Sequence, residues 1–242
     1  MIASLPMYDW PELTQAHDNF WNKFADQLRS NDIDAPQNLS RNAQDESYWL
    51  APNLIIGQTC GYPLSTTLRG KVTYLATPVY NVQGCNGPYY SSAIIARKNS
   101  ELTFDKIASA RFAYNSQNSL SGYRSIKALV GNPDKYFSKL VQSGGHRNSA
   151  RHVANGAADI AALDAVCWHL LQQHEPEAAS ELKVIGWTDQ YPALPLITAL
   201  HTPIATVDTI RKVLIALPPE KELAINRFEV LNIADYNKLS AL

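Results

Sequence analysis

The sequence predicts an α/β fold, and three features lead to that prediction. Short apolar runs alternate with stretches whose apolar residues recur at helical spacing, which is typical of βαβ units and a mainly parallel sheet. Apolar residues make up 45% of the chain and charged residues 18%, as in folded domains rather than disordered chains. The length of 242 residues suffices for one large domain or two small lobes.

The apolar pattern places the elements in order along the chain. An amphipathic helix is expected where apolar and aromatic residues recur at helical spacing between residues 13 and 28. The expected strands are 2–6, 54–57, 72–77, 89–96, 110–114, 140–142, 158–163 and 182–187. The other expected helices are 123–130, about 148–155, 165–174 and 207–217.

The simplest arrangement of these elements has two lobes, each a mainly parallel sheet flanked by helices. Residues 1–88 with 191–242 are expected to form a discontinuous first lobe, and residues 89–190 the second. The chain would cross between lobes near 84–92 and 186–195, where turn-forming residues gather, and these crossings would make a hinge.

A polar segment joins a predicted strand to a predicted helix at Asn115–Gly122, and it is the strongest candidate site. Backbone N–H groups at the start of a helix carry partial positive charge, so an anion can bind there without a lysine. Gly122 lets a ligand approach the backbone, and Ser119 and Ser121 add hydroxyl groups. On pattern alone, a serine that only caps the helix explains the segment equally well.

Other polar residues also follow predicted strands. His146, after two glycines, either donates to an anion or caps a helix; Gln58 and Thr59 follow another strand, and Tyr8 follows the first. Ligands of open α/β sheets bind beyond the carboxyl ends of strands, which these residues share. Asp164 also follows a strand, and both a cleft-facing carboxylate and a helix N-cap remain open for it.

The three cysteines do not have the spacing of a metal framework. A Cys60–Cys85 disulfide and inert thiols both remain open. No nucleophile elbow, phosphate-binding loop, dinucleotide fingerprint or zinc-protease motif occurs, and no cofactor is expected. Cys60, His146 and Asp164 could be combined as nucleophile, base and orienting group, but nothing in their spacing requires it, so binding is favoured over catalysis.

Charge and hydropathy bear on partners and location. The formal net charge is −1, so no global field favours nucleic acid or an anionic membrane. No apolar stretch reaches membrane-spanning length, and the first residues do not resemble a secretory signal. The chain is therefore expected to be either a cytoplasmic product or a mature form whose signal was removed, and a monomer.

Four segments in order resemble the substrate-binding components of phosphate/phosphite/phosphonate-type ABC transporters. These segments are QTCGYP at 58–63, NSLSG at 118–122, SGGHRNS at 143–149 and VANGAADIAA at 153–162. The resemblance implies a type 2 periplasmic-binding-protein fold, with a ligand cleft between two lobes that close by hinge motion. It also implies a periplasmic location and an ABC permease as partner.

The resemblance implies roles for particular residues. Ser119, the backbone N–H of Leu120, Ser121 and His146 would hold the anionic head group, and Tyr8, Gln58 and Thr59 would line the other wall. Two features depart from a simple phosphate site. Leu120 stands where phosphonate binders often have a hydroxyl group, and Asp164 adds a carboxylate that favours a ligand with an amine. A zwitterionic or cation-bearing solute is therefore expected rather than bare phosphate.

Two other functions remain open beside the solute receptor. One is a cytoplasmic enzyme on the same fold, either with thiol chemistry at Cys60 or related to pyrimidine synthesis. The other is a ligand-sensing module, although no DNA-binding helix pair or basic patch accompanies it.

Overall fold

The computed structural model describes residues 1–41 and 46–242, and these form two compact units. Unit 1 comprises Met1–Asn81 and Pro192–Ser240, and unit 2 comprises Val82–Tyr191 and Ala241–Leu242. Residues 82–88, which the sequence pattern assigned to the first lobe, thus belong to unit 2. No helix in the described part of the chain is long and apolar enough to cross a membrane.

Unit 1 is built on a five-stranded sheet with the order β1-β2-β12-β3-β13. The strands are β1 (Ile2–Ser4), β2 (Leu54–Gln58), β12 (Leu196–Ala199), β3 (Val72–Tyr80) and β13 (Ile225–Glu229). β1 and β2 are parallel, whereas β12 runs antiparallel to β2 and β3, and β13 antiparallel to β3. The sheet is therefore mixed, not mainly parallel, because the tail returns as two strands that the sequence analysis did not predict.

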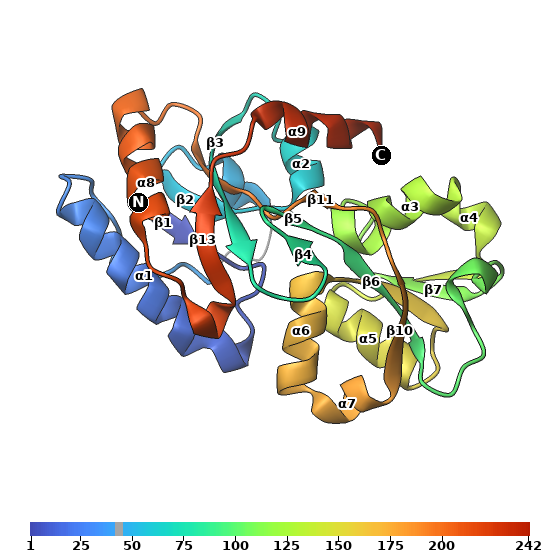
Figure 1. Ribbon diagram of the computed structural model, residues 1–242. Coiled ribbons are helices and arrows are strands. Elements are labelled where there is room, and N and C mark those ends of the chain that lie inside the picture. The colour runs from blue at the N-terminus through green and yellow to red at the C-terminus, as the bar shows by residue number, and fades with distance from the viewer. Residues whose placement is uncertain (42–45) are drawn as a thin grey trace. The chain divides into compact units, whose positions relative to one another are not determined.

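Long helices of unit 1 pack through their apolar faces. These are α1 (Thr14–Arg29) and α8 (Ile204–Ala216), which lie side by side in Figure 1. Phe20, Trp21 and Phe24 of α1 are buried at the spacing that the sequence predicted. The short helices α2 (Gly61–Ser65) and α9 (Ile233–Asn237) pack against each other.

Unit 2 has its own five-stranded sheet, with the order β10-β6-β9-β7-β8. The strands are β10 (Leu182–Trp187), β6 (Ser92–Arg97), β9 (Ile160–Asp164), β7 (Arg111–Tyr114) and β8 (Lys139–Gln142). β7 is parallel to β8 and β9, whereas β6 is antiparallel to β9 and β10. This sheet is also mixed. All five residues of β9 are buried, as expected for a central strand.

Helices cover both faces of the unit 2 sheet (Figure 1). They are α3 (Ser125–Val130), α4 (Pro133–Tyr136), α5 (His146–Ala154), α6 (Ala165–His174) and α7 (Pro176–Ser180). α5 packs against β6, β7 and β9. Phe112 and Phe137 pack against each other in the core with tilted rings whose centroids are 4.9 Å apart. Burial of such aromatic side chains provides much of the stability of the unit.

The remaining elements are short. β4 (Cys85–Asn86) and β5 (Tyr89–Tyr90) form a hairpin, and β11 (Tyr191–Pro192) lies where the chain passes from unit 2 back to unit 1. Single helical turns occur at η1 (Pro11–Leu13), η2 (Glu46–Leu50), η3 (Phe104–Lys106), η4 (Leu120–Arg124), η5 (Lys221–Leu223) and η6 (Lys238–Ala241). Of these turns, η4 contains Leu120 and Ser121 of the candidate site.

Candidate functional site

The predicted strand-to-helix turn of unit 2 forms from β7 to α3 and contains the π-helical turn η4. Ser119 is the N-cap residue, and its Oγ accepts a hydrogen bond from the backbone N–H of Gly122 at 3.0 Å. Ser119 therefore caps the turn, and its contact with an anion stays a prediction. The Ser119 and Ser121 hydroxyl oxygens lie 3.5 Å apart, and both side chains are buried. The turn therefore places two hydroxyl groups at a helix start, where N–H groups lack partners within the helix.

Gly122 leaves space that the Asn115 side chain fills. A Cβ atom at position 122 would lie 2.0 Å from Asn115 Oδ1, much closer than atoms can approach. Asn115 Oδ1 also accepts from the backbone N–H of Ser116 at 2.9 Å. Glycine at position 122 thus lets the Asn115 side chain lie across the turn.

His146, the first residue of α5, joins this turn from the other side. Its Nε2 atom lies 2.8 Å from Ser121 Oγ and 3.4 Å from Asn115 Nδ2. Burial lowers the pKa of His146 to about 4, and an interaction with the backbone of Ala162 opposes this only in part. The imidazole is therefore neutral near pH 7, so the cluster of Asn115, Ser119, Ser121 and His146 (the polar cluster) is uncharged.

The predicted residues of unit 1 also lie together, through a residue that the sequence analysis did not select. The rings of Tyr8 and Tyr80 meet edge to face with centroids 5.3 Å apart, and Gln58 Nε2 donates to Tyr80 Oη at 3.3 Å. Thr59 is fully buried, and its N–H donates to the carbonyl of Pro195 at 3.1 Å. Tyr80, the last residue of β3, therefore links Tyr8 to Gln58.

A buried histidine supports Tyr8 from α1. His17 Nε2 lies 3.2 Å from the carbonyl oxygen of Tyr8, and burial lowers the pKa of His17, opposed in part by the charge of Asp9. Arg41 bridges Asp9 and Asp18 at 2.6 and 2.7 Å, which fixes the segment after β1. Unit 1 thus holds the residues that follow β1 in place with groups outside the predicted site.

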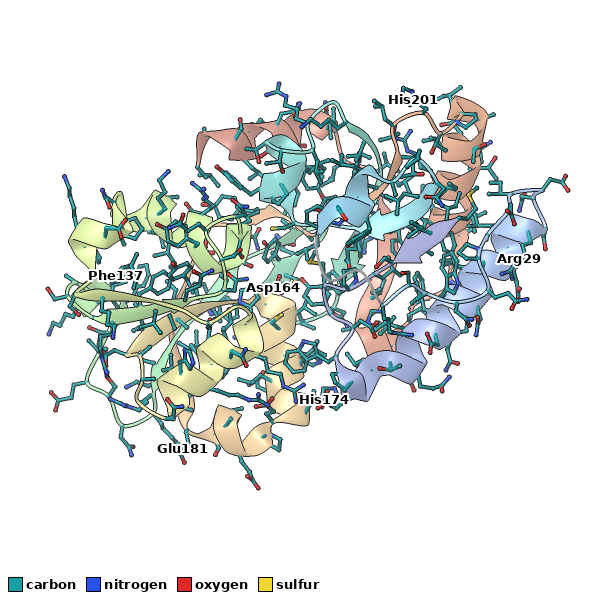
Figure 2. All side chains as sticks on the ribbon, turned by 180° about the vertical axis from the view of Figure 1, so that it is seen from behind. Arg29, Phe137, Asp164, His174, Glu181 and His201 are labelled. Carbon is teal, nitrogen blue, oxygen red and sulfur yellow. The ribbon has the colours of Figure 1, made fainter. Side chains whose placement is uncertain are left out.

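Asp164 caps helix α6 (Figure 2). Its Oδ1 atom accepts from the N–H groups of Val166 at 2.8 Å and Cys167 at 3.2 Å, and the side chain is buried. The capping role that the sequence left open is therefore present, and it places the carboxylate charge at a favourable helix end. A contact with ligand remains a prediction.

This capping role leads to a stability prediction. Asp164→Ala leaves two buried N–H groups without their acceptor, so we expect the free energy of unfolding to fall by about 1–2 kcal/mol. Asp164→Asn keeps an acceptor oxygen, and we expect a clearly smaller loss. Urea unfolding followed by circular dichroism measures both. Equal losses in the two variants would contradict the capping account and would point to the charge instead.

The thiols do not form the disulfide that the sequence left open. Cys60, Cys85 and Cys167 are all free, so a Cys60–Cys85 bond is absent. Burial, with a smaller effect from the Asp164 carboxylate, raises the pKa of Cys85 to about 12 and also raises the pKa of Cys167. Both are therefore protonated and weakly nucleophilic at neutral pH. Among residues 1–41 and 46–242, no three His, Cys, Asp or Glu side chains gather as a metal site would require.

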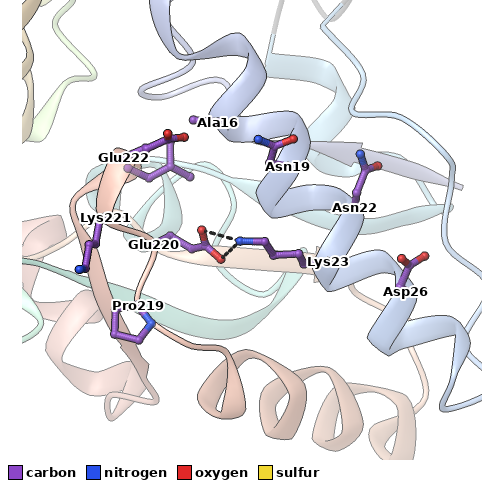
Figure 3. Close-up of a pocket in the computed structure, with 10 residues that line it drawn as sticks. Ala16, Asn19, Asn22, Lys23, Asp26, Pro219, Glu220, Lys221 and Glu222 are labelled. Atoms are coloured by element: carbon purple, nitrogen blue, oxygen red, sulfur yellow. Dashed lines mark hydrogen bonds and ion pairs between the residues drawn. The ribbon is translucent and has the colours of Figure 1, made fainter.

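A surface groove on unit 1 contains none of the predicted ligand residues (Figure 3). It lies between α1 and residues 219–223 and has a volume of about 570 Å³. Lys23 of α1 pairs with Glu220 across it at 2.9 Å. Lys23 and Lys221 line the groove together with Asp26, Glu220 and Glu222, so acidic groups outnumber basic ones and the groove does not favour an anion.

Asn115 belongs to the polar cluster of unit 2, and Tyr80 joins Tyr8 and Gln58 in unit 1. Neither residue was among the site residues predicted from the sequence. Asn115 lies within the segment that the sequence singled out, yet only the close approach of Gly122 reveals its position. Tyr80 ends a strand that was expected to stop at residue 77, so its position at a strand end was hidden.

The sequence matches one known protein family over most of its length. A model of the family described as periplasmic phosphonate substrate-binding proteins of ABC transporters matches residues 58–240. No match is found among curated proteins.

Solved structures share the fold at low sequence identity. A binding protein component of an ABC phosphonate transporter from Pseudomonas aeruginosa is 19% identical, with a TM-score of 0.75 over 97% of this chain and 83% of that one. PhnD1 from Prochlorococcus marinus, solved with methylphosphonate, is 18% identical, with a TM-score of 0.75 over 99% and 96%. A Xanthomonas citri protein bound to ATP is 16% identical, with a TM-score of 0.72 over 100% and 95%. The prediction of an α/β type 2 periplasmic-binding-protein fold is therefore confirmed.

Proposed function

The chain belongs to the family of periplasmic phosphonate substrate-binding proteins of ABC transporters, and we propose that it binds a small phosphonate-like solute without transforming it. The observation that carries this proposal is the polar cluster of unit 2. Ser121 Oγ and His146 Nε2 lie 2.8 Å apart beside a helix start, and the imidazole is neutral. Such a cluster offers hydroxyl and backbone N–H groups to an oxyanion.

Neutral donors suit reversible binding of an anion. Hydrogen bonds to a charged oxygen are stronger than those between neutral groups, so a few hydroxyl and N–H groups provide useful affinity. The Ser119 hydroxyl and the backbone N–H of Leu120 are the donors in this proposal, and Ser121, which contacts His146, places its hydroxyl oxygen beside the same anion. No step in this role requires a nucleophile, a metal ion or a cofactor.

The wider role also follows from family membership as a proposal. The chain would deliver its solute to an ABC permease, working as a monomer in the periplasm. Tyr8, Gln58 and Thr59 are proposed to contact the ligand as well, and this is supported by the contacts of Tyr8 and Gln58 with Tyr80. The ligand cleft and its hinge remain predictions from the resemblance.

The ligand class is proposed to include zwitterions. Asp164 is a buried carboxylate at the carboxyl end of β9, the kind of position where ligands of α/β sheets bind. A ligand amine near this carboxylate would compensate for the repulsion between carboxylate and phosphonate. This reasoning favours aminoalkylphosphonates over inorganic phosphate.

Isothermal titration calorimetry with purified chain tests both parts. The ligands are methylphosphonate, 2-aminoethylphosphonate, phosphite and phosphate, and Asp164→Asn is the matched variant. We expect single-site binding of the phosphonates, with the amine preference reduced in Asp164→Asn by about tenfold. Tight phosphate binding without an amine preference would remove the zwitterion proposal. No binding of any of the four would overturn the proposed function.

A cysteine variant separates binding from thiol chemistry. We expect Cys60→Ser to leave the affinity for methylphosphonate unchanged within about twofold, since the proposed donors are hydroxyl and N–H groups. Titration calorimetry measures the affinity, and phosphorus NMR of the recovered ligand shows whether it is intact. Conversion of the ligand by the wild-type chain, abolished in Cys60→Ser, would establish the enzyme alternative.

A further inference from the structure

The proton positions in the polar cluster follow from the orientation of one amide. The backbone N–H of Ser116 donates to Asn115 Oδ1 at 2.9 Å, so this atom must be the amide oxygen. The Asn115 nitrogen, which carries only donors, then faces His146 Nε2 at 3.4 Å. A Cβ atom at position 122 would overlap Asn115 Oδ1, so glycine at this position leaves room for this orientation.

This orientation assigns the tautomer of His146. An amide N–H that faces Nε2 is compatible with a lone pair there and incompatible with a second proton. Since the imidazole is neutral, its proton must be on Nδ1. Nδ1 is enclosed and makes no hydrogen bond of standard geometry with the described residues, while the backbone of Ala162 favours a protonated ring. The contact at Nε2 therefore favours the Nδ1–H tautomer.

The tautomer in turn fixes the role of Ser121. With a lone pair on Nε2, the 2.8 Å contact is a hydrogen bond that Ser121 Oγ donates to His146. A hydroxyl group has one proton, so Ser121 Oγ offers only lone pairs to any further partner. The lone pairs of a fully deprotonated oxyanion would repel those of Ser121 Oγ. A ligand O–H group would instead donate a hydrogen bond to Ser121 Oγ.

We propose that the polar cluster takes its phosphonate as the singly protonated monoanion, with the ligand P–O–H group donating to Ser121 Oγ. This inference rests on the proposed function, because it specifies the ionisation state of the ligand in that same site. The remaining unprotonated oxygens of the ligand accept from backbone N–H groups at the start of η4. The site then discriminates between two ionisation states of one molecule.

Charged groups on the elements packed around α5 are largely paired with one another. Glu175 pairs with Arg147 and Arg151, and Asp159 pairs with Arg111. The other titratable residues on α5, α6, α7, β6, β7 and β9 are Arg97, Tyr114, His152, Asp164, Cys167, His169, His174 and Glu177. A test must therefore separate ionisation of the ligand from ionisation of the protein.

The test is calorimetry over a pH series with two ligands, methylphosphonate and a fluorinated methylphosphonate whose second ionisation occurs at lower pH. Above the second ionisation of each ligand, we expect affinity to fall by about tenfold per pH unit. The pH at which the affinity begins to fall should be lower for the fluorinated ligand. An onset common to both ligands, an affinity independent of pH, or tighter binding at high pH would overturn this inference alone. Absence of binding of both ligands would overturn the proposed function with it.

Two further measurements keep the inference falsifiable. Ser121→Ala should lose the pH dependence, whereas Ser125→Ala, whose hydroxyl donates to the Ser121 carbonyl at 2.9 Å, should keep it. Nitrogen NMR of the histidines in the ligand-free wild-type chain reports the tautomer without any ligand. A proton on Nδ1 of His146 supports the inference, and a proton on Nε2 overturns it.

Discussion

Replacing Gly122 with alanine is expected to lower the affinity for methylphosphonate by about 100-fold, because several hydrogen bonds of the site depend on this position. The new methyl group would lie 2.0 Å from Asn115 Oδ1, so the amide must leave its place. Its contacts with the Ser116 N–H and with His146 Nε2 are then lost. Titration calorimetry measures the affinity, and circular dichroism shows whether the fold is retained.

Gly145 offers a matched control in the same unit. Nothing lies within 4 Å of a Cβ atom built at this residue, and its φ of −169° is extended backbone that alanine readily adopts. We expect Gly145→Ala to bind methylphosphonate within about threefold of the wild type. Similar affinities for Gly122→Ala and the wild type would show that the Asn115 contact is unimportant for binding.

Acidification is expected to destabilise unit 2 through His146. Its pKa is lowered to about 4 in the folded chain from an ordinary value of 6.5, so the unfolded chain binds more protons between these values. The contribution to stability is complete above the unfolded pKa and is lost as the pH falls through this window. Between pH 7 and about pH 4.5, we expect a loss of about 2–3 kcal/mol from this residue.

His146→Gln isolates this contribution because other groups also titrate in the window. Urea unfolding of both chains, measured at neutral and acidic pH, gives the difference due to His146. On acidification, we expect the free energy of unfolding of the wild type to fall by about 2–3 kcal/mol more than that of His146→Gln. An identical acid loss in both chains would mean that His146 titrates normally, and the neutral imidazole of the proposed site would then be wrong.

Local patterns in the sequence predicted much of the fold. The alternation of apolar runs identified the two-lobed α/β architecture, and the helical spacing of Phe20, Trp21 and Phe24 identified α1. Central strands such as β9 were recognised because all their residues are apolar up to Asp164. These features depend on residues near one another in the chain, which is why they could be predicted.

Pairing between distant segments could not be predicted in the same way. β12 and β13 return from the tail and insert antiparallel beside β3, and this makes the sheet of unit 1 mixed. Their sequences do not show which strand they pair with, and the burial of β13, with two adjacent exposed residues between Ile225 and Phe228, does not alternate regularly. The transition into unit 2 at Val82 instead of residue 89 has the same origin, since it depends on tertiary contacts.

Some residues of the candidate site could also be predicted from local sequence, and others could not. Ser119 and Ser121 lie on a helix start that the sequence identified, and His146 lies 2.8 Å from Ser121 although the two residues are far apart in the chain. The resemblance placed these residues in one site, whereas their spacing alone did not. Asn115 and Tyr80 needed the structure, because a packing contact with Gly122 and the full length of β3 reveal their positions.

NMR of the backbone amides of Leu120, Ser121 and Gly122 during titration with methylphosphonate tests anion binding at this turn. We expect saturable shifts that are largest at these amides and at His146, with the affinity found by calorimetry. Saturable shifts that spare residues 119–122 and His146, or no shifts at all, would contradict the claim that this turn binds the anionic group.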